Sequence, residues 1–84
     1  MNAENPTDAL NRADVLTALV DYRKRKEIRQ VDVARDMGIG QPSVSELERG
    51  MTSPRMETVQ RYARALGLEL VFVVRGLDYD DEEG

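Results

Sequence analysis

The stretch QVDVARDMGIGQPSVSELERG, residues 30–50, decides the fold of this 84-residue chain. Its pattern rests on four residues at fixed spacing: Ala34, Gly38, Val44 and Leu47. Two short helices that cross closely and steeply need a small residue at their contact, which Ala34 supplies. The tight turn between them needs a left-handed residue, and Gly38 adopts that conformation readily. The pattern therefore predicts helices at 30–37 and 41–49 joined by a tight turn.

The second of these helices is predicted to have an inner side and a displayed side. Val44 and Leu47 define the inner side, which anchors the helix on the core. Pro42 is tolerated because the first helical turn has no internal N–H partner to lose. At about 100° per residue, most polar residues of 41–49 then lie on the other side, free to enter a DNA groove. A glutamine at the start of such a helix can bond adenine N6 and N7 together, so Gln41 is expected to read a base.

The remaining side chains of this surface are assigned by their length and charge. Glu46 is expected either to accept from cytosine N4 or to repel phosphate and so select against other sequences. Arg49 and Arg55 are long cations placed where the DNA backbone usually passes. Gln30 opens the first helix, where its side chain and backbone N–H can hold a phosphate. The complete predicted DNA-binding set is Arg29, Gln30, Gln41, Pro42, Ser43, Ser45, Glu46, Arg49 and Arg55.

Residues 30–50 resemble the phage-repressor and Cro-like (XRE-type) helix-turn-helix family. The resemblance continues through the Ser-Pro pair at 53–54 and through 62–67, and it covers roughly residues 12–75. It implies a mainly α fold, a lambda-repressor-like domain of four to five helices that binds DNA. In that family, the positions that commonly meet phosphate or bases match Gln30, Gln41, Pro42 and Glu46.

Two positions depart from the family's pattern. Arg29 and Gly40 precede the two motif helices, where the family usually has Ser or Thr. A side chain that caps the helix start is therefore missing at both places. Arg29 is expected to contact a phosphate in place of the missing cap.

Two further helices are predicted around the motif. The first starts between Thr7 and Asn11, since Thr7 and Asp8 can cap it, and ends near Lys26. Its apolar stripe consists of Val15, Leu16, Leu19 and Val20. Ser53 is predicted to cap the last helix and Pro54 to open it. Its inner face consists of Met56, Val59, Ala63 and Leu66, and Gly67 ends it.

The segment ELVFVV, residues 69–74, has no helical period and is rich in β-branched residues, so it predicts a strand. It resembles the C-terminal strand of antitoxins related to the HipB repressor, which pairs with its dimer mate. A lone apolar strand leaves its backbone groups unpaired and invites association. We therefore expect pairing across a homodimer, although folding against its own chain or extension of the last helix stays open. The predicted dimerisation residues are Leu70, Val71, Phe72, Val73 and Val74.

The charge of the chain is unevenly distributed. The formal net charge is −4, but five of the 16 acidic residues lie in 78–83, which leaves 11 acids against 12 bases, a balance of +1. Basic residues cluster at 23–26 and at Arg29, either as a solvated helix end or as phosphate contacts. We expect a polar arm at 1–10, one DNA-binding domain at 11–76 and a disordered acidic tail at 77–84.

The residue inventory argues against catalysis. The chain has no His and no Cys, so the commonest general base, thiol nucleophile and zinc ligands are absent. We expect no enzyme activity, no cofactor and no metal site. A polar start without a signal-peptide pattern and the lack of a long apolar run predict a cytoplasmic protein without membrane contact.

These features predict a homodimeric transcriptional repressor that binds a palindromic operator. Its recognition helices would lie about 34 Å apart on DNA half-sites one turn apart. The predicted biological role is the antitoxin and autoregulator of a type II toxin-antitoxin operon, with a kinase-like (HipA-type) toxin favoured as partner. The alternatives are a phage-type or accessory regulator without a toxin, and a protein-interaction module.

Overall fold

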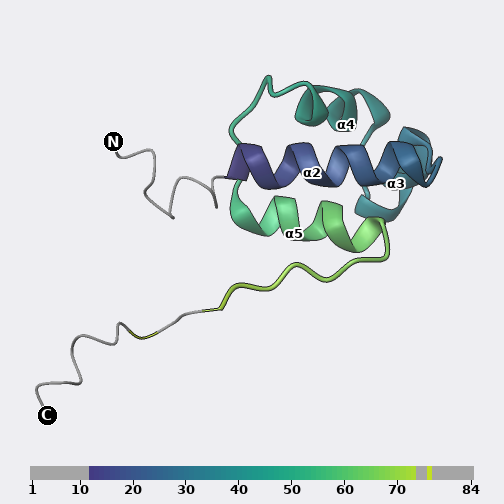
Figure 1. Cartoon of the computed structure of the whole chain (residues 1–84). Coiled ribbons are helices and arrows are strands. Elements are labelled where there is room, and N and C mark those ends of the chain that lie inside the picture. Colours follow the sequence, from purple (N-terminus) through teal and green to yellow (C-terminus); the bar gives the residue numbers. More distant parts are fainter. Residues whose placement is uncertain (1–11, 74–75, 77–84) are drawn as a thin grey trace, which may run out of the picture.

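The structure is a computed structural model that describes residues 12–73 and residue 76. Its helices are α2 (Arg12–Arg25), α3 (Gln30–Met37), α4 (Gln41–Glu48) and α5 (Met56–Ala65). α2 lies across the middle of the fold between α4 and α5, and α3 lies at one end of it (Figure 1). In the described part of the chain, no helix is long and apolar enough to cross a membrane.

α2 supplies one wall of the core through the stripe predicted for it. Leu16, Leu19 and Val20 are buried, and Val15 is half-buried against them. The helix ends at Arg25, where the chain turns with Glu27 in the left-handed region at φ 58°. The predicted start between Thr7 and Asn11 lies outside the described residues.

α3, the turn and α4 follow the prediction closely. Gly38 is left-handed at φ 74°, and the N–H of Ile39 donates to the carbonyl of Ala34 at 3.0 Å. Ala34 is 3% exposed. Its small side chain allows α3 and α4 to approach closely. α4 ends at Glu48 rather than Arg49, which forms its C-cap. As expected for Arg29 and Gly40, neither α3 nor α4 has a side-chain cap at its start.

α5 begins two residues later than predicted. Arg55 is extended at ψ 158°, and its carbonyl accepts from the N–H groups of Thr58 and Val59 at 2.9 and 3.1 Å. The assignment of Ser53 as cap and Pro54 as first residue was therefore wrong. A Ser-Pro pair also suits an extended loop, since the residue before proline is pushed out of the helical region. The predicted inner face is confirmed, and the fully buried Tyr62 joins it.

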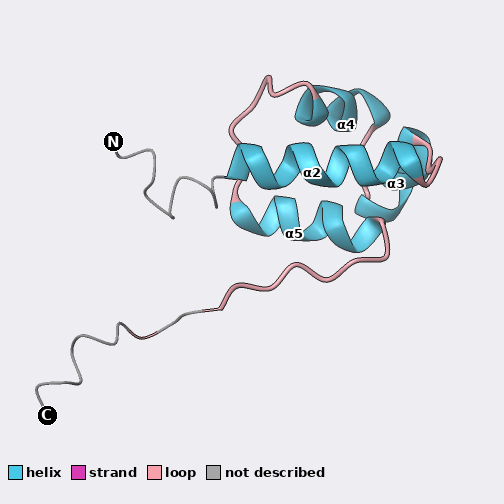
Figure 2. Cartoon of the chain, in the orientation of Figure 1, coloured by secondary structure: helices cyan, strands magenta, loops and turns pink. Residues whose placement is uncertain are grey.

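The segment after α5 forms no strand within 66–73, and Figure 2 shows it as a loop that runs back beside α5. Leu68 and Leu70 pack against the core, and the amide of Gln60 donates to the carbonyl of Leu70 at 3.2 Å. This first half therefore folds against its own chain, and the helix is not extended. Val71, Phe72 and Val73 remain exposed, at 65%, 46% and 80%. Val74, the 1–10 arm and the 77–84 tail lie outside the described residues.

Candidate nucleic-acid interface

The outer side of α4 is displayed to solvent. Val44 and Leu47 are 0% and 5% exposed, so they fix the helix on the core. Ser45 is half-buried, whereas five predicted residues of this region are exposed: Gln41, Pro42, Ser43, Glu46 and Arg49. Arg49 Nε donates back to the carbonyl of Ser45 at 3.4 Å, which holds its side chain along the helix. The helix is thus anchored on one side and open on the other, as a groove reader requires.

One edge of α4 brings together the two glutamines predicted to bind DNA. Nε2 of Gln41 donates to Oε1 of Gln30 at 3.3 Å, which joins the start of α4 to the start of α3. Nε2 of Gln30 in turn donates to Oε1 of Glu48 at 2.9 Å. The amide of Gln41 therefore has a hydrogen-bond partner at the start of α3.

Glu48 is the centre of a buried polar cluster that the sequence analysis missed. Its carboxylate accepts from Arg23 Nε at 2.6 Å and from Arg23 Nη2 at 2.8 Å. The hydroxyl of Tyr62 donates to it at 2.5 Å, and Arg23 Nη1 donates to the carbonyl of Ile28 at 2.8 Å. The cluster joins all four described helices, and the Arg23 and Glu48 side chains are only 10% and 5% exposed.

The cluster keeps its charges because its partners compensate for burial. Burial alone would raise the pKa of Glu48, but bonds from Arg23, Tyr62 and Gln30 hold that pKa below its usual value. Burial and the bond to Glu48 raise the pKa of the Tyr62 hydroxyl. Burial would lower the pKa of Arg23, but the carboxylate of Glu48 raises it. Glu48 is therefore ionised at neutral pH and acts only as an acceptor.

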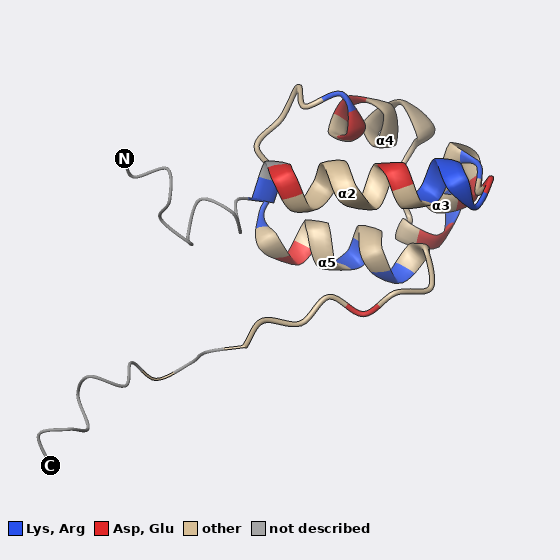
Figure 3. Ribbon diagram, viewed as in Figure 1, with Lys and Arg blue, Asp and Glu red and all other residues tan. Residues whose placement is uncertain are grey.

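Arg23 corrects the interpretation of the basic cluster. It is 8% exposed and bound to Glu48, so at this position the cluster is neither a solvated helix end nor a phosphate contact. The burial of Arg23 could have been predicted from the sequence, because Arg23 lies four residues after Leu19 and continues the apolar stripe of α2. Lys24, Arg25 and Lys26 are exposed. Figure 3 shows this positive charge at the end of α2.

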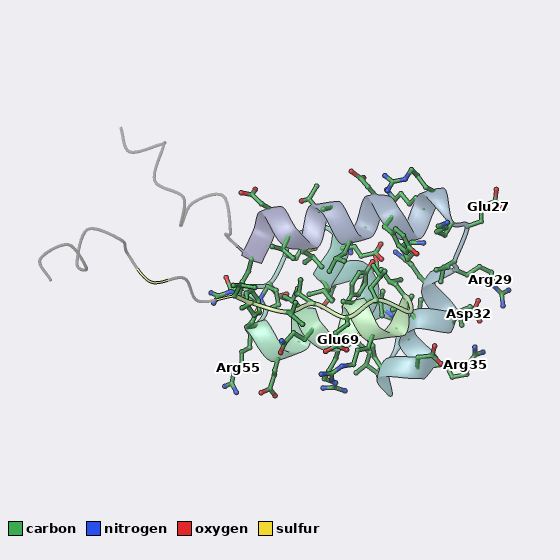
Figure 4. The ribbon with its side chains drawn as sticks, turned by 60° about the horizontal axis from the view of Figure 1, so that its bottom comes forward. Glu27, Arg29, Asp32, Arg35, Arg55 and Glu69 are labelled. Carbon is green, nitrogen blue, oxygen red and sulfur yellow. The ribbon has the colours of Figure 1, made fainter. Side chains whose placement is uncertain are left out.

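The other edge of α4 borders an open cleft of about 500 Å³ beside the start of α5. Its lining includes Ser43, Glu46 and Arg55. Three predicted residues are therefore brought together there, with an exposed cation on one side and an exposed carboxylate on the other. Arg55 and Arg29 lie at opposite ends of the helical part of the chain (Figure 4).

Arg29 is exposed but already has a partner. Its Nε lies 3.0 Å from Oδ2 of Asp32, and Arg35 pairs with the same carboxylate at 3.2 Å. The two bonds from Arg29 lower the pKa of Asp32. A phosphate at Arg29 would therefore compete with Asp32, and the predicted contact stays a prediction.

Comparison with known families now identifies the fold. The family described as helix-turn-helix matches residues 19–73, from the second half of α2 to the exposed C-terminal segment. The chain belongs to this helix-turn-helix family. α3 and α4 are thus the two helices of the motif, and the resemblance to phage repressors is confirmed.

Three relatives illustrate the helix-turn-helix family. Antitoxin HigA1 from Mycobacterium tuberculosis is 42% identical over 67 residues, which are 80% of this chain and 45% of the relative. The regulator DdrOP3 from Deinococcus deserti is 33% identical over 73% of this chain and 47% of its own length. The phage repressor RstR from Vibrio cholerae is 29% identical over 63 residues, which are 75% of this chain and 57% of the relative. The chain thus spans about half the length of these relatives, and no solved structure matches it.

Within this helix-turn-helix domain, the described residues hold no group of three or more His, Cys, Asp or Glu side chains that could bind a metal ion. Every buried side-chain nitrogen and oxygen among them has a hydrogen-bond partner. The polar groups available for a ligand among the described residues are therefore exposed ones, and they include those on α4 and its two edges.

Proposed function

We propose that this protein is a sequence-specific transcriptional repressor that reads the DNA major groove with α4. The observation that carries the proposal is the contrast between the two sides of α4. Val44 and Leu47 are buried, whereas Gln41, Glu46 and Arg49 are displayed. A rigidly seated helix with an open polar side is what major-groove reading requires. The names of the relatives, which include regulators and a repressor, support the same function.

The proposed contacts fall into two groups. Four residues on or near the outer side of α4 meet base edges: Gln41, Pro42, Ser45 and Glu46. The others position the protein on the phosphates, from both edges of the helix and from its end: Arg29, Gln30, Ser43, Arg49 and Arg55. Phosphate contacts fix the register on DNA, and base contacts supply the specificity.

The repressor is proposed to act as a cytoplasmic homodimer on a palindromic operator. The exposed Val71, Phe72 and Val73 follow a half-buried stretch that is already fastened to α5 through Gln60. An exposed apolar segment of this kind pairs most simply with its own copy. Such pairing would turn this segment into the strand that the sequence predicts for 69–74.

The proposed biological role is that of an antitoxin that represses its own operon. The relative named antitoxin HigA1 supports this role, and it implies a toxin protein as partner. The names of the three relatives described above do not support the kinase-like (HipA-type) toxin that the sequence analysis favoured. An accessory regulator without a toxin is the second candidate, because DdrOP3 and RstR bear the names of a regulator and a repressor. Co-purification with the product of a neighbouring gene would distinguish the two.

Selection of bound duplexes from a random pool tests the DNA-binding proposal. We expect an enriched palindrome with half-sites about one helical turn apart, and an affinity that falls steeply with salt. Gln41→Ala should lose about 1–3 kcal/mol of discrimination at one base, whereas Arg49→Ala should weaken binding to all sequences alike. No enrichment together with a flat salt dependence would refute the proposed function.

A further inference from the structure

A directed chain of hydrogen bonds leads from the buried cluster to the displayed end of α4. Gln41 donates to Gln30, and Gln30 donates to Glu48, with each bond made by an amide Nε2. Glu48 stands at the inner end of the chain and is 5% exposed at its side chain. Gln41 stands at the outer end and is exposed.

The direction of this chain is fixed by chemistry at Glu48. An ionised carboxylate accepts hydrogen bonds and cannot donate them, whereas an amide can do either, depending on which way it faces. Gln30 must therefore turn its NH2 group toward Glu48, which leaves its oxygen toward Gln41. Gln41 must then turn its own NH2 group toward Gln30. Its oxygen and one remaining N–H are left for a ligand.

An oxygen beside a single N–H matches only some base edges in the major groove. Adenine presents a donor at N6 and an acceptor at N7, so the oxygen of Gln41 can accept and its free N–H can donate. Guanine presents acceptors at both O6 and N7, so its O6 would face the oxygen of Gln41. The held amide therefore favours adenine over guanine.

We propose that Glu48 is a positioning residue that sets the direction of the Gln41 amide and so selects adenine over guanine at the base which Gln41 meets. The proposal rests on the DNA-binding function proposed above and adds the source of its specificity. Arg23 supports the arrangement, because its two bonds to the carboxylate keep an anion at this place.

Two substitutions test whether Glu48 sets the direction of the Gln41 amide or only stabilises the fold. Glu48→Gln keeps the shape and can still accept from Arg23, but its new NH2 group can face Gln30 and reverse both glutamines. Tyr62→Phe removes a different bond to the same carboxylate and leaves Glu48 an acceptor. A third variant, Gln30→Met, cuts the chain outside the core at a half-buried residue.

The test measures duplex binding by fluorescence anisotropy with adenine or guanine at one position of the selected operator. That position is the one whose preference Gln41→Ala abolishes. The wild-type protein should prefer adenine by about ten- to a hundredfold, the range for one bidentate contact. We expect Glu48→Gln and Gln30→Met to reduce this ratio below about threefold. Tyr62→Phe should keep the ratio within about twofold while it lowers the urea midpoint.

Each other outcome speaks against the proposal. It is wrong if folded Glu48→Gln keeps the wild-type ratio, or if Tyr62→Phe reduces the ratio equally. If Glu48→Gln does not fold by circular dichroism, Gln30→Met decides alone, and an unchanged ratio overturns the proposal. A wild-type preference for another base at this position overturns it too, while the repressor function stands. Only a wild-type protein that selects no duplex would refute both the role of Glu48 and the repressor function.

Discussion

Replacement of Arg23 by methionine should nearly unfold this domain. The change removes two hydrogen bonds to Glu48 and one to the carbonyl of Ile28, and it leaves the carboxylate without its cation. Loss of one partner from a buried ion pair typically costs about 3–5 kcal/mol. A domain with roughly 60 ordered residues has a total unfolding free energy of about 3–9 kcal/mol. The loss at this one position is therefore comparable with the whole stability.

Urea unfolding followed by circular dichroism measures this loss, with Lys24→Met as the matched control. Lys24 is the exposed neighbour on α2, so its loss should change the unfolding free energy by only about 0.5 kcal/mol. A second substitution, Glu48→Met in the Arg23→Met background, removes the uncompensated charge and should restore part of the stability. Two protein concentrations separate the effect from dimer dissociation. A loss below about 1 kcal/mol for Arg23→Met would refute the reasoning.

Four further outcomes can be checked with simple assays. Gly38→Ala should cost about 1–2 kcal/mol in urea from left-handed strain alone, because no atom lies within 4 Å of the added Cβ. The lowered pKa of Glu48 means that its stabilisation is complete above its unfolded pKa of about 4.3 and is lost below it, so acidification should lower the urea midpoint less in Glu48→Gln. The raised pKa of Tyr62 predicts a second loss above about pH 10 that Tyr62→Phe lacks. Lysines at Val71 and Val73 should give a monomer in analytical ultracentrifugation with unchanged helix content, and a persistent dimer would contradict the proposed pairing.

The motif itself could be predicted almost residue by residue because its signals are local. Ala34, Gly38, Val44 and Leu47 each have a structural reason that depends on neighbours within one or two helical turns. The start of α5 was less predictable, since capping preferences at Ser53 and Pro54 fit a loop as well as a helix.

The polar cluster under α4 was not predicted because its members are distant in sequence. Arg23 and Glu48 are separated by 25 residues, and each looks like an ordinary surface charge until both helices are placed. A charged residue is seldom buried without a partner, and the partner cannot be read from one sequence. The displayed side of α4 needed no such information, because exposure follows from helical geometry once Val44 and Leu47 are buried.

The contacts of Glu48 with the other three described helices limit how the DNA specificity of this domain can be changed. Grafting another repressor's reading helix would have to preserve the glutamate at 48, because the cation at Arg23 is already built into the neighbouring helix. Exchanges at Pro42 and Glu46 change only the solvent side of α4 and leave the contacts of Glu48 intact. Libraries of variants with altered specificity should therefore randomise the exposed positions of α4 and keep Glu48 unchanged.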